Sequence, residues 1–346
     1  MYFATVCGNV FLMINTTITD IAKKLKISSS TVSRALNNHP DIKQETKDQV
    51  KKLAKKLNYS PNPIARSLKT KRTNVIGVIV PEIKHDFFSS AISGIEEVAY
   101  HSGYIILVCQ SNESLEREII NTNALMHQRV AGLIVSISQN TKNGNHFKEP
   151  IDRGIPLVFF DRACSDISTN KVIIDDAQSA FVAVTHLVER GHKKIAHFSG
   201  PKTLEICKQR LKGYKDALKK ANLPLLKELI KYGDLHEDNG YESMDTLLKE
   251  NNIPDAIFAV NDPVAIGAFQ RIKEAGLKIP EDIAIVGFSN NKITSLVDPP
   301  LTTVNQPSFN MGKRAAEILI EMIKNKGFND YKTIVLDAEL IVRGST

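Results

Sequence analysis

Residues 17–69 read TITDIAKKLKISSSTVSRALNNHPDIKQETKDQVKKLAKKLNYSPNPIARSLK and decide the fold of the N-terminal part of the chain. The hydroxyl of Thr17, followed three residues later by the carboxylate of Asp20, is a capping-box pattern that marks the start of a helix. Apolar residues then recur at helical spacing through three short segments. The stretch therefore predicts a helix-turn-helix, a motif that places one helix in the major groove of DNA.

The second of these helices, expected over 29–37, carries side chains suited to reading DNA bases. Its spacing places Val32 and Leu36 inward and turns hydroxyls and one arginine outward. Short hydroxyls bond to several base edges, and arginine makes bidentate contacts with guanine. The residues expected to contact DNA in and around this helix are Thr17, Ser28, Ser29, Ser30, Thr31, Ser33, Arg34 and Asn37.

The third helix has an apolar stripe at Val50, Leu53, Ala54 and Leu57, with lysines 51, 52, 55 and 56 on its other face. A solvent-exposed helix without a DNA role would also show such lysines. The charge of the whole segment is therefore needed to decide between a solvated and a DNA-binding surface. Residues 16–73 contain 14 basic and 4 acidic residues, whereas the rest of the chain contains 31 and 34. Positive charge is thus concentrated in one small module, as phosphate binding requires.

A proline-punctuated segment follows Tyr59. Asn62 is a good N-cap and Pro63 suits the first helical position, which predicts a hinge helix of about seven residues. A helix of this length is unstable alone and is expected to order only against a partner surface. Leu68 suits insertion between base steps in the minor groove. The alternative is a flexible linker whose leucine packs on the next domain.

Several runs along the chain resemble the lactose/galactose repressor (LacI/GalR) family of bacterial transcription regulators. These runs are ITDIAKKLKISSSTVSRALN, NYSPNPIARSLK, GIPLVFFDR, ERGHKKIAHFSGP and PLTTVNQP, and they occur in the family's order from about Thr17 to the C-terminus. The resemblance implies a homodimer that binds a palindromic double-stranded DNA operator and inserts a leucine from each hinge helix. The DNA contacts that it implies near the hinge are Tyr59, Asn62, Leu68 and Lys69.

Length and composition are those of a globular protein of two or three domains. The chain has 346 residues, of which 42% are hydrophobic and 24% charged. Its four cysteines show no CxxC or zinc spacing, which favours a reduced, cytoplasmic protein. No apolar run approaches the ~20 residues that a membrane helix needs, so we expect no membrane association.

Residues 1–15 are apolar but lack the basic n-region and small-residue cleavage site of a signal peptide. We interpret them as an over-extended start, with Met13 as the initiator, or else as a disordered extension. No leucine-heptad tail follows Thr346, which favours a dimer over a tetramer.

From Asn74 onward, short apolar strands alternate with amphipathic helices, a pattern typical of parallel α/β sheets. The repetition occurs twice and predicts two similar lobes. One of the helices is expected to run from Phe87 to Ser102. The expected strands are 75–80, 105–109, 132–137, 157–161, 171–174, 194–198, 256–260 and 283–287.

The resemblance implies that these lobes form a periplasmic-binding-protein-like core, with two doubly wound parallel sheets and a ligand in the cleft between them. The expected domains are a helix-turn-helix at 16–60, a hinge helix and linker at 61–73, and an effector-binding and dimerisation core at 74–346. The first lobe takes about 74–174 and 306–335, and the second about 175–305 and 336–346. The chain is expected to cross near Asp175, Gln306 and Leu336.

Polar and aromatic residues fall at the carboxyl ends of the predicted strands, where open parallel sheets bind ligands. An aromatic ring together with arginine, carboxylate and amide groups suits a polyhydroxylated ring. Each residue also has a structural alternative: Asp262 is a possible N-cap and Phe87 a possible core residue. The candidate effector-binding residues are Asp86, Phe87, Phe88, Arg162, Arg210, Asn261, Asp262, Ser289 and Gln306.

Ser289 departs from the family pattern, because sugar- and purine-binding relatives usually carry an aspartate after this strand. A serine makes weaker, neutral hydrogen bonds than a carboxylate. The effector is therefore expected to be a sugar or sugar derivative, with an acidic or phosphorylated sugar, a smaller ligand or another orientation as alternatives.

Catalytic functions lack sequence support. The nine histidines show no metal-binding spacing, and the chain contains no GxxxxGK[ST], GxGxxG or GxSxG motif. We therefore expect no enzyme activity, no cofactor and no metal. The rival interpretation is a sugar-binding receptor without a DNA role, and the basic module at 16–73 argues against it. The expected protein is a DNA-binding transcriptional repressor switched by a small-molecule effector.

Overall fold

The computed structural model describes residues 16–57, 59, 73–325 and 330–346. It divides into two compact units, with the boundary between Thr73 and Asn74. Three predictions concern residues outside these ranges. They are the interpretation of residues 1–15, the hinge helix, and the expected DNA contacts of Asn62, Leu68 and Lys69.

The first unit contains the three predicted helices, α1 (Ile18–Leu25), α2 (Ser29–Leu36) and α3 (Gln44–Lys56). The capping box at the start of α1 is confirmed, because the Thr17 hydroxyl accepts from the Asp20 backbone and the Asp20 carboxylate accepts from the Thr17 backbone. The described helices enclose a small core whose fully buried members include Ile21, Val32 and Val50.

The expected inward face of α2 is confirmed, because Val32 is fully buried and Leu36, although half-buried, packs against the core. Ala35, which was not predicted, is also fully buried. The helix ends one residue earlier than expected, with Asn37 as its C-cap. Along α3, Val50 and Ala54 are buried and the four lysines are exposed, as the apolar stripe predicts.

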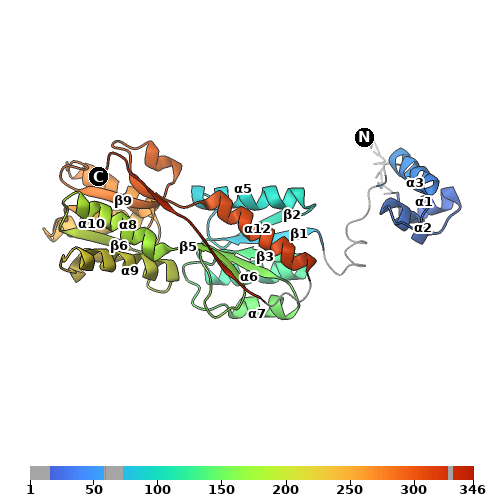
Figure 1. Cartoon of the computed structure of the whole chain (residues 1–346), viewed down its shortest axis with the longest axis horizontal. Helices are drawn as coiled ribbons and strands as arrows, with labels where there is room; N and C mark the ends of the chain where they lie inside the picture. Colours follow the sequence, from blue (N-terminus) through green and yellow to red (C-terminus); the bar gives the residue numbers. More distant parts are fainter. Residues whose placement is uncertain (1–15, 58, 60–72, 326–329) are drawn as a thin grey trace, which may run out of the picture. The chain divides into compact units, whose positions relative to one another are not determined.

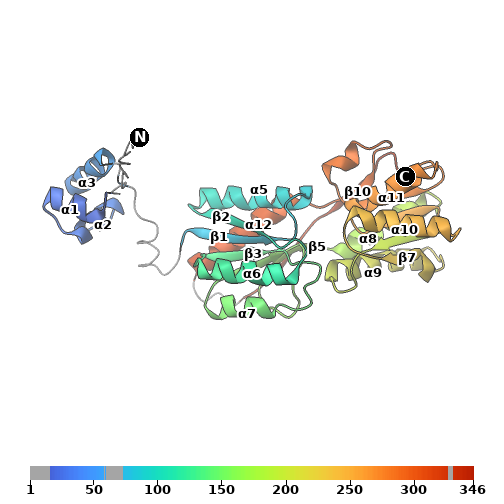
Figure 2. The same ribbon diagram turned by 180° about the vertical axis from the view of Figure 1, so that it is seen from behind.

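The second unit consists of two lobes, each built on a six-stranded sheet (Figures 1 and 2). The sheet of the first lobe has the order β11-β5-β4-β3-β1-β2, and all its neighbouring strands are parallel. Helices α5 (Asp86–His101) and α12 (Ser308–Lys324) cover one face, and α6 (Leu115–His127) and α7 (Asn145–Asp152) cover the other. Its strands are β1 (Val75–Val80), β2 (Ile105–Gln110), β3 (Gly132–Val135), β4 (Leu157–Phe160), β5 (Asn170–Ile174) and β11 (Thr333–Leu336).

The sheet of the second lobe has the order β12-β10-β9-β8-β6-β7. Its helices are α8 (Asp176–Glu189) and α9 (Glu205–Lys220), which pack together on one face, and α10 (Glu237–Lys249) and α11 (Asp262–Glu274), which pack on the other. Short 3₁₀ helices lie at Lys227–Leu229 and Lys292–Ser295. Its strands are β6 (Ile195–Ser199), β7 (Ile230–Tyr232), β8 (Ala256–Ala259), β9 (Ala284–Ser289), β10 (Thr302–Asn305) and β12 (Glu339–Ile341).

The predicted class, an α-helical DNA-binding unit followed by two parallel α/β lobes, is confirmed. The eight predicted strands are all present with small differences at their ends, but β7, β10, β11 and β12 were missed. These four have only three or four residues each, and β11 alternates exposed and half-buried positions, so none forms a continuous apolar run. One detail also differs from an all-parallel sheet, because β12 pairs antiparallel to β10.

The chain passes between the lobes three times, after β5, after β10 and between β11 and β12. Helix α5 is held against α12 by two glycines at their contact. An added Cβ at Gly94 would lie 2.1 Å from the carbonyl oxygen of Phe309, and one at Gly312 would lie 1.9 Å from that of Ala91. This close packing fixes the N-terminal end of α5, which faces the space between the lobes. No helix among the described residues is both long and apolar enough to cross a bilayer.

Candidate effector and DNA-binding sites

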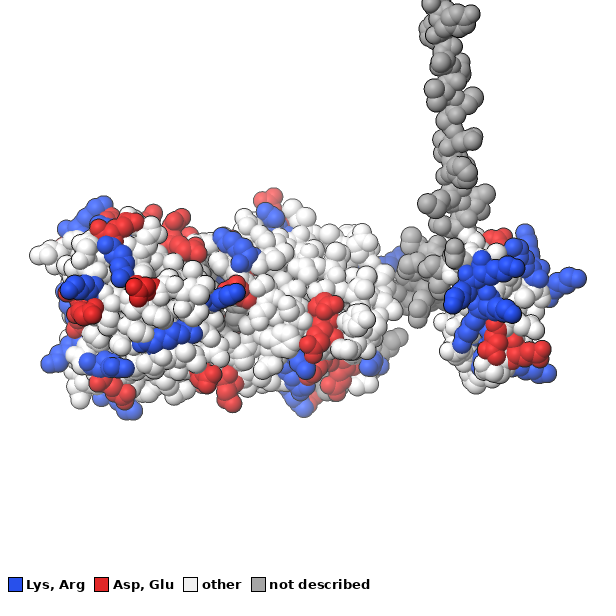
Figure 3. Space-filling model, turned by 90° about the horizontal axis from the view of Figure 1, so that it is seen from above, with Lys and Arg blue, Asp and Glu red and all other residues white. Residues whose placement is uncertain are grey.

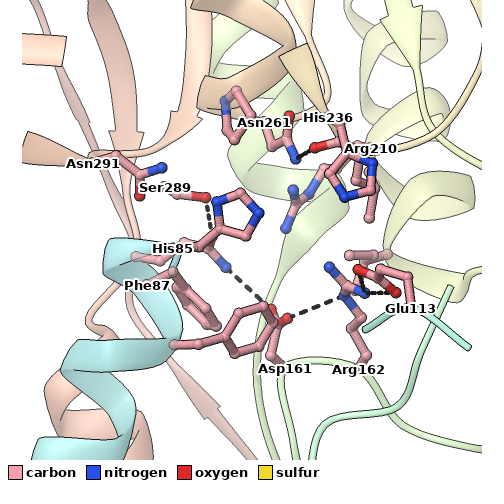
Figure 4. Close-up of a pocket in the computed structure, with 15 residues that line it drawn as sticks. His85, Phe87, Glu113, Asp161, Arg162, Arg210, His236, Asn261, Ser289 and Asn291 are labelled. Atoms are coloured by element: carbon pink, nitrogen blue, oxygen red, sulfur yellow. Dashed lines mark hydrogen bonds and ion pairs between the residues drawn. The ribbon is translucent and has the colours of Figure 1, made fainter. Parts of the chain in front are cut away.

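A cavity of about 40 Å³ lies between the two lobes (Figure 4). Seven of the nine predicted effector-binding residues line it: Phe87, Phe88, Arg162, Arg210, Asn261, Ser289 and Gln306. Ligand pockets for drug-sized molecules usually measure roughly 300–1,000 Å³. The lobes are therefore closed on the site, and a sugar-sized ligand requires them to part.

Two aromatic rings form the apolar part of the wall. Phe87 and Phe88 lie in the first turn of α5, are nearly buried, and meet edge to face with ring centroids 5.1 Å apart. The guanidinium of Arg162 lies 5.5 Å from the centroid of the Phe88 ring. The rings offer an apolar surface for the face of a planar or sugar ring, while polar groups surround its edge.

Arg162 is already paired with carboxylates. Its Nη1 donates to both carboxylate oxygens of Glu113, at 2.8 and 3.1 Å, and its Nε lies 3.7 Å from a carboxylate oxygen of Asp161. Burial raises the pKa of Asp161, against the opposing effect of the Arg162 and Arg210 guanidiniums. Burial alone would lower the pKa of Arg162, but Glu113 and Asp161 hold it above its ordinary value.

Arg210 is bound in the same way within the second lobe. Its Nε donates to Asp176 at 2.8 Å and its Nη1 donates to the carbonyl of Val260 at 2.7 Å. The guanidinium also lies 3.7 Å from the centroid of the Phe288 ring. Burial raises the pKa of Asp176 to about 6 despite the arginine. Both arginines thus belong to ion pairs that are nearly buried.

A hydrogen-bonded chain links the lobes at the crossing after β10. The Ser289 hydroxyl donates to Oε1 of Gln306 at 2.8 Å, and Nε2 of Gln306 donates to Asp161 at 3.4 Å. Ser289 has a φ of +123°, in a region that L-residues rarely adopt. Such a conformation costs of order 1–3 kcal/mol and concentrates at functional sites. The backbone thus holds the Ser289 hydroxyl at the hinge.

Two buried polar atoms on cavity-lining side chains have no hydrogen-bond partner among the described residues. They are Nε of Arg162, a donor, and Oδ1 of Asn291, an acceptor. Leaving such a group unsatisfied costs about 1–3 kcal/mol. Two side chains of the cavity wall therefore each carry one polar atom without a partner, a donor and an acceptor.

Two predicted residues do not line this cavity. Asp86 is exposed at the start of α5, where its carboxylate accepts from the backbone N–H of Lys292, in the other lobe, at 2.7 Å. Asp262 is fully buried and accepts from the Thr303 hydroxyl at 2.6 Å and the Asn291 backbone at 2.7 Å, and burial raises its pKa to about 6. Asp86 thus holds the lobes together, and Asp262 supports the loop that carries Asn291.

The N-cap of α11 is Asn261 rather than Asp262, the residue considered for that role from the sequence. Its side-chain oxygen accepts from the Val264 backbone at 3.0 Å, and its amide donates to the Leu235 carbonyl at 2.8 Å. Asn261 lines the cavity while serving as a cap. The cavity-lining residues that the sequence prediction missed are His85, Glu113, Asp161, Ile206, Leu235, His236, Pro263 and Asn291.

In the first unit, several predicted DNA-contacting residues also shape their own helix. The Ser28 hydroxyl caps α2 by accepting from the Thr31 backbone at 3.1 Å and lies 2.7 Å from the Ser30 hydroxyl. The Asn37 amide donates to the Ser33 carbonyl at 2.8 Å. Thr17 caps α1, and Tyr59 packs against the helical core.

Arg34 is exposed on α2, as are Ser30 and Asn37, whereas Ser29, Thr31 and Ser33 are half-buried. Lysine and arginine side chains gather on one face of the first unit (Figure 3). A helix with exposed polar tips beside a positive surface is suited to the major groove and its flanking phosphates.

A helical unit with this surface, joined to a two-lobed core that encloses a polar cavity, defines a ligand-responsive DNA-binding regulator. Residues 17–62 match the bacterial regulatory proteins of the lacI family, and residues 184–346 match a periplasmic binding protein-like domain. The chain is 34% identical to the HTH-type transcriptional repressor PurR of Vibrio vulnificus (strain CMCP6), over 94% of this chain and 97% of the relative. The chain belongs to the LacI family.

Solved structures agree with this assignment. A lac repressor dimer bound to operator and the anti-inducer ONPF is 25% identical, with a TM-score of 0.83, covering 96% of this chain and 99% of the other. A complex of the transcriptional regulator CelR with cellobiose is 27% identical, with a TM-score of 0.73, covering 96% of this chain and 100% of the other. The protein is therefore a transcriptional regulator of the LacI family. The rival interpretation, a receptor without a DNA role, is not favoured.

Proposed function

We propose that the chain represses transcription in the cytoplasm and that its operator affinity is set by a neutral, hydroxylated effector of the sugar class. The effector binds in the cavity between the lobes, with its ring against Phe87 and Phe88. Its hydroxyls bond to the polar side chains at the opposite wall. The chain acts by binding alone, without a catalytic step.

The donor and the acceptor without partners carry this proposal. A hydroxyl group both donates and accepts, so neighbouring hydroxyls of one sugar satisfy Nε of Arg162 and Oδ1 of Asn291 together. A ligand with only acceptors would leave Asn291 unsatisfied. The similar structure of the transcriptional regulator CelR in complex with cellobiose is consistent with this class of effector.

Charge balance favours a neutral sugar over a phosphorylated one. Glu113 and Asp161 already compensate Arg162, and Asp176 already compensates Arg210. A phosphate entering the cavity would have to displace one of these carboxylates, which would then be buried without a partner. Removing one member of a buried ion pair costs about 3–5 kcal/mol.

On the DNA side, we propose that α2 reads bases through Arg34, with Ser29, Ser30 and Ser33 at its other exposed or half-exposed positions. The lysines of α3 contribute charge that is independent of sequence. This division is supported by the exposure of Arg34 and of lysines 51, 52, 55 and 56.

Coupling between the two sites follows from the contacts across the cleft. Asp86 accepts from Lys292, and the Thr203 hydroxyl donates to the carbonyl of Gln139 at 3.2 Å. Both contacts form only when the lobes are closed. An effector with different affinities for the closed and open states shifts their populations, and operator affinity follows.

Fluorescence anisotropy of labelled DNA from upstream of the gene and its neighbours tests the proposal. The full-length protein is titrated onto each fragment with a panel of neutral sugars, each paired with its phosphorylated form. We expect one neutral sugar to change the affinity of a two-fold symmetric site, and its phosphate to have little effect. A response confined to phosphorylated or acidic compounds would overturn the effector class.

A further inference from the structure

Three side chains from both lobes meet at one edge of the cleft. Glu82 and His85 lie between β1 and α5 in the first lobe, and His236 lies between β7 and α10 in the second. Nε2 of His85 is 2.6 Å and Nε2 of His236 is 3.3 Å from Oε2 of Glu82. One potential ligand atom from each residue lies within 4.8 Å of the other two. Both histidines also line the effector cavity, as labelled in Figure 4.

The carboxylate at the centre of this cluster is buried. The Glu82 side chain is 8% exposed, and imidazole nitrogens from both lobes lie within ion-pair distance of its Oε2. A buried carboxylate requires compensation by positive charge. The nearby Nζ of Lys84 is 3.6 Å away, but that side chain is 63% exposed and free to extend into solvent. A buried carboxylate between two imidazoles is a donor set suited to a cation.

His236 is oriented by a second carboxylate. Its Nδ1 lies 3.2 Å from Oδ2 of Asp234, on the side of the ring away from Glu82. Asp234 therefore lies on the Nδ1 side of the ring, and Nε2 is the nitrogen directed toward Glu82. A carboxylate on the far nitrogen is the usual way in which proteins orient a metal-binding histidine.

We propose that Glu82, His85 and His236 bind one divalent transition-metal ion, of which Zn²⁺ is the representative, and that this ion ties the two lobes together. Two imidazoles and one carboxylate with an open fourth position form a common zinc donor set. Imidazole nitrogen disfavours Mg²⁺ and Ca²⁺, which prefer oxygen ligands. The fourth position takes water or a hydroxyl of the effector.

The distances fit such an ion after small side-chain rotations. Ligand atoms around tetrahedral Zn²⁺ lie about 3.3 Å apart for bonds of about 2.0–2.1 Å. The distance between Nε2 of His236 and Oε2 of Glu82 is already 3.3 Å. Nε2 of His85 must move away from Oε2 of Glu82 by about 0.7 Å, from 2.6 to about 3.3 Å, and the His85 side chain is 18% exposed, so it has room to rotate.

An ion held by both lobes binds the closed state better than the open state and therefore stabilises closure by mass action. The effect on DNA rests on the proposed function, because it requires closure to control operator affinity. The metal site itself does not depend on that function.

Metal binding is tested on the full-length protein after dialysis against a chelator. Zn²⁺ is titrated in competition with a chromophoric indicator, and Co²⁺ is added separately as a spectroscopic probe. We expect one Zn²⁺ per chain and a Co²⁺ spectrum with d–d bands but no thiolate charge-transfer band. Such a spectrum excludes binding through the free cysteines.

His236→Gln and Glu82→Gln should each weaken Zn²⁺ binding at least tenfold, since even changes in the residues that support metal ligands cost 10–100-fold. Two variants are used so that a folding defect in one, detected by circular dichroism, leaves the other informative. His192→Gln is the matched control, because His192 is also half-buried and lies 3.8 Å from a carboxylate, that of Asp255, away from the cleft.

Equal Zn²⁺ affinity in the wild type and both cleft variants would overturn the proposal, as would a thiolate band with Co²⁺. If the protein does not bind Zn²⁺ and the histidines instead show a pH-dependent change, protons rather than a metal ion neutralise the cluster. This result would also overturn the proposal. The protein could also bind the operator and respond to the sugar normally without binding Zn²⁺. That result would overturn the metal site and leave the proposed function intact.

Discussion

The hydroxyl of Ser289 donates to Oε1 of Gln306 at 2.8 Å and so joins the end of β9 to the point where the chain crosses from the second lobe to the first. Gln306 continues the contact to Asp161, within the first lobe. The Ser289 hydroxyl therefore positions Gln306 and, through it, the carboxylate of Asp161 beside Arg162. The effector cavity and the hinge share these side chains.

Ser289→Ala is expected to lower effector affinity about 3- to 10-fold, because a typical intramolecular hydrogen bond contributes about 0.5–1.5 kcal/mol. The substitution also leaves Oε1 of the buried Gln306 without its donor. Isothermal titration with the effector measures the change. Ser295→Ala removes a hydroxyl that bonds to the Lys292 carbonyl outside the cavity, and it should leave the affinity unchanged. An equal effect of both variants would contradict a specific role for Ser289.

Asp86→Ala removes a contact between the two lobes, the hydrogen bond from the Lys292 backbone N–H to the Asp86 carboxylate. We expect a several-fold gain of effector affinity without a change in any side chain that lines the main cavity. The reason is that weaker closure raises the population of the parted lobes, which a sugar-sized ligand requires. Small-angle scattering with and without effector should show a larger open fraction in the variant.

The control for this change is Glu116→Ala, which removes an exposed carboxylate from the first turn of α6, away from the lobe contact. Its effector affinity should match the wild type. Wild-type affinity in Asp86→Ala would show that the contact with Lys292 contributes nothing to closure.

The residues that sequence reasoning found share one property: their strand or motif is clear in the sequence. Phe87, Arg162 and Ser289 follow apolar runs that become β1, β4 and β9, so the strand-end rule places them at the cleft. The rule does not give the direction of a side chain. Asp262 follows β8 in the same way, yet its carboxylate turns into the lobe toward Thr303.

The missed residues lie where sequence patterns are weak. Leu235 and His236 follow β7, a strand of only three residues, and Glu113 lies in a turn with a positive φ of 56° after β2. Histidine spacing along the chain likewise gave no sign of the cluster with Glu82. His85 and His236 are 151 positions apart and meet only because the lobes close.

His197 makes stability depend on pH. It is fully buried between the rings of Tyr214 and Phe258, and burial lowers its pKa from 6.5 to about 4. Between these values the unfolded chain binds a proton that the folded chain excludes, so stability is lost as the pH falls from 6.5 toward 4. The loss approaches about 3 kcal/mol for this one group.

His197→Phe should therefore flatten the pH dependence of stability between pH 6.5 and 4, since phenylalanine keeps the ring stacking and has no titrating nitrogen. Urea unfolding at several pH values measures the effect. His127→Phe, at an exposed position, is the control and should retain the wild-type slope. The same slope in His197→Phe as in the wild type would assign the pH dependence to other groups.

Arg34→Ala tests the base-reading role of α2. A bidentate arginine contact contributes about 1–3 kcal/mol of discrimination against the wrong base. We expect binding to the operator to fall about 5- to 150-fold, with much less loss on unrelated DNA. Lys52→Ala, on the exposed face of α3, should weaken binding to both kinds of DNA by a similar factor. A uniform loss on all DNA in Arg34→Ala would make Arg34 a phosphate contact.

We expect the chain to form a dimer through the edge strand β2 of the first lobe. β2 is the last strand in the sheet of the first lobe, and Ile105 and Leu107 on it are 68% and 43% exposed. Two apolar side chains on the helices that flank this strand are also exposed. Tyr100, at the end of α5, is 72% exposed, and Ile120, on α6, is 58% exposed. An exposed apolar edge strand of this kind is a site of association between chains.

Leu107→Lys should convert the dimer to a monomer, because a charge would be buried at the contact without a partner. Sedimentation equilibrium measures the molar mass, and operator affinity should fall with it because the two half-sites are then bound separately. Leu225→Lys is a close control, since Leu225 is 42% exposed in the second lobe. A stable dimer of Leu107→Lys would place the interface elsewhere on the core.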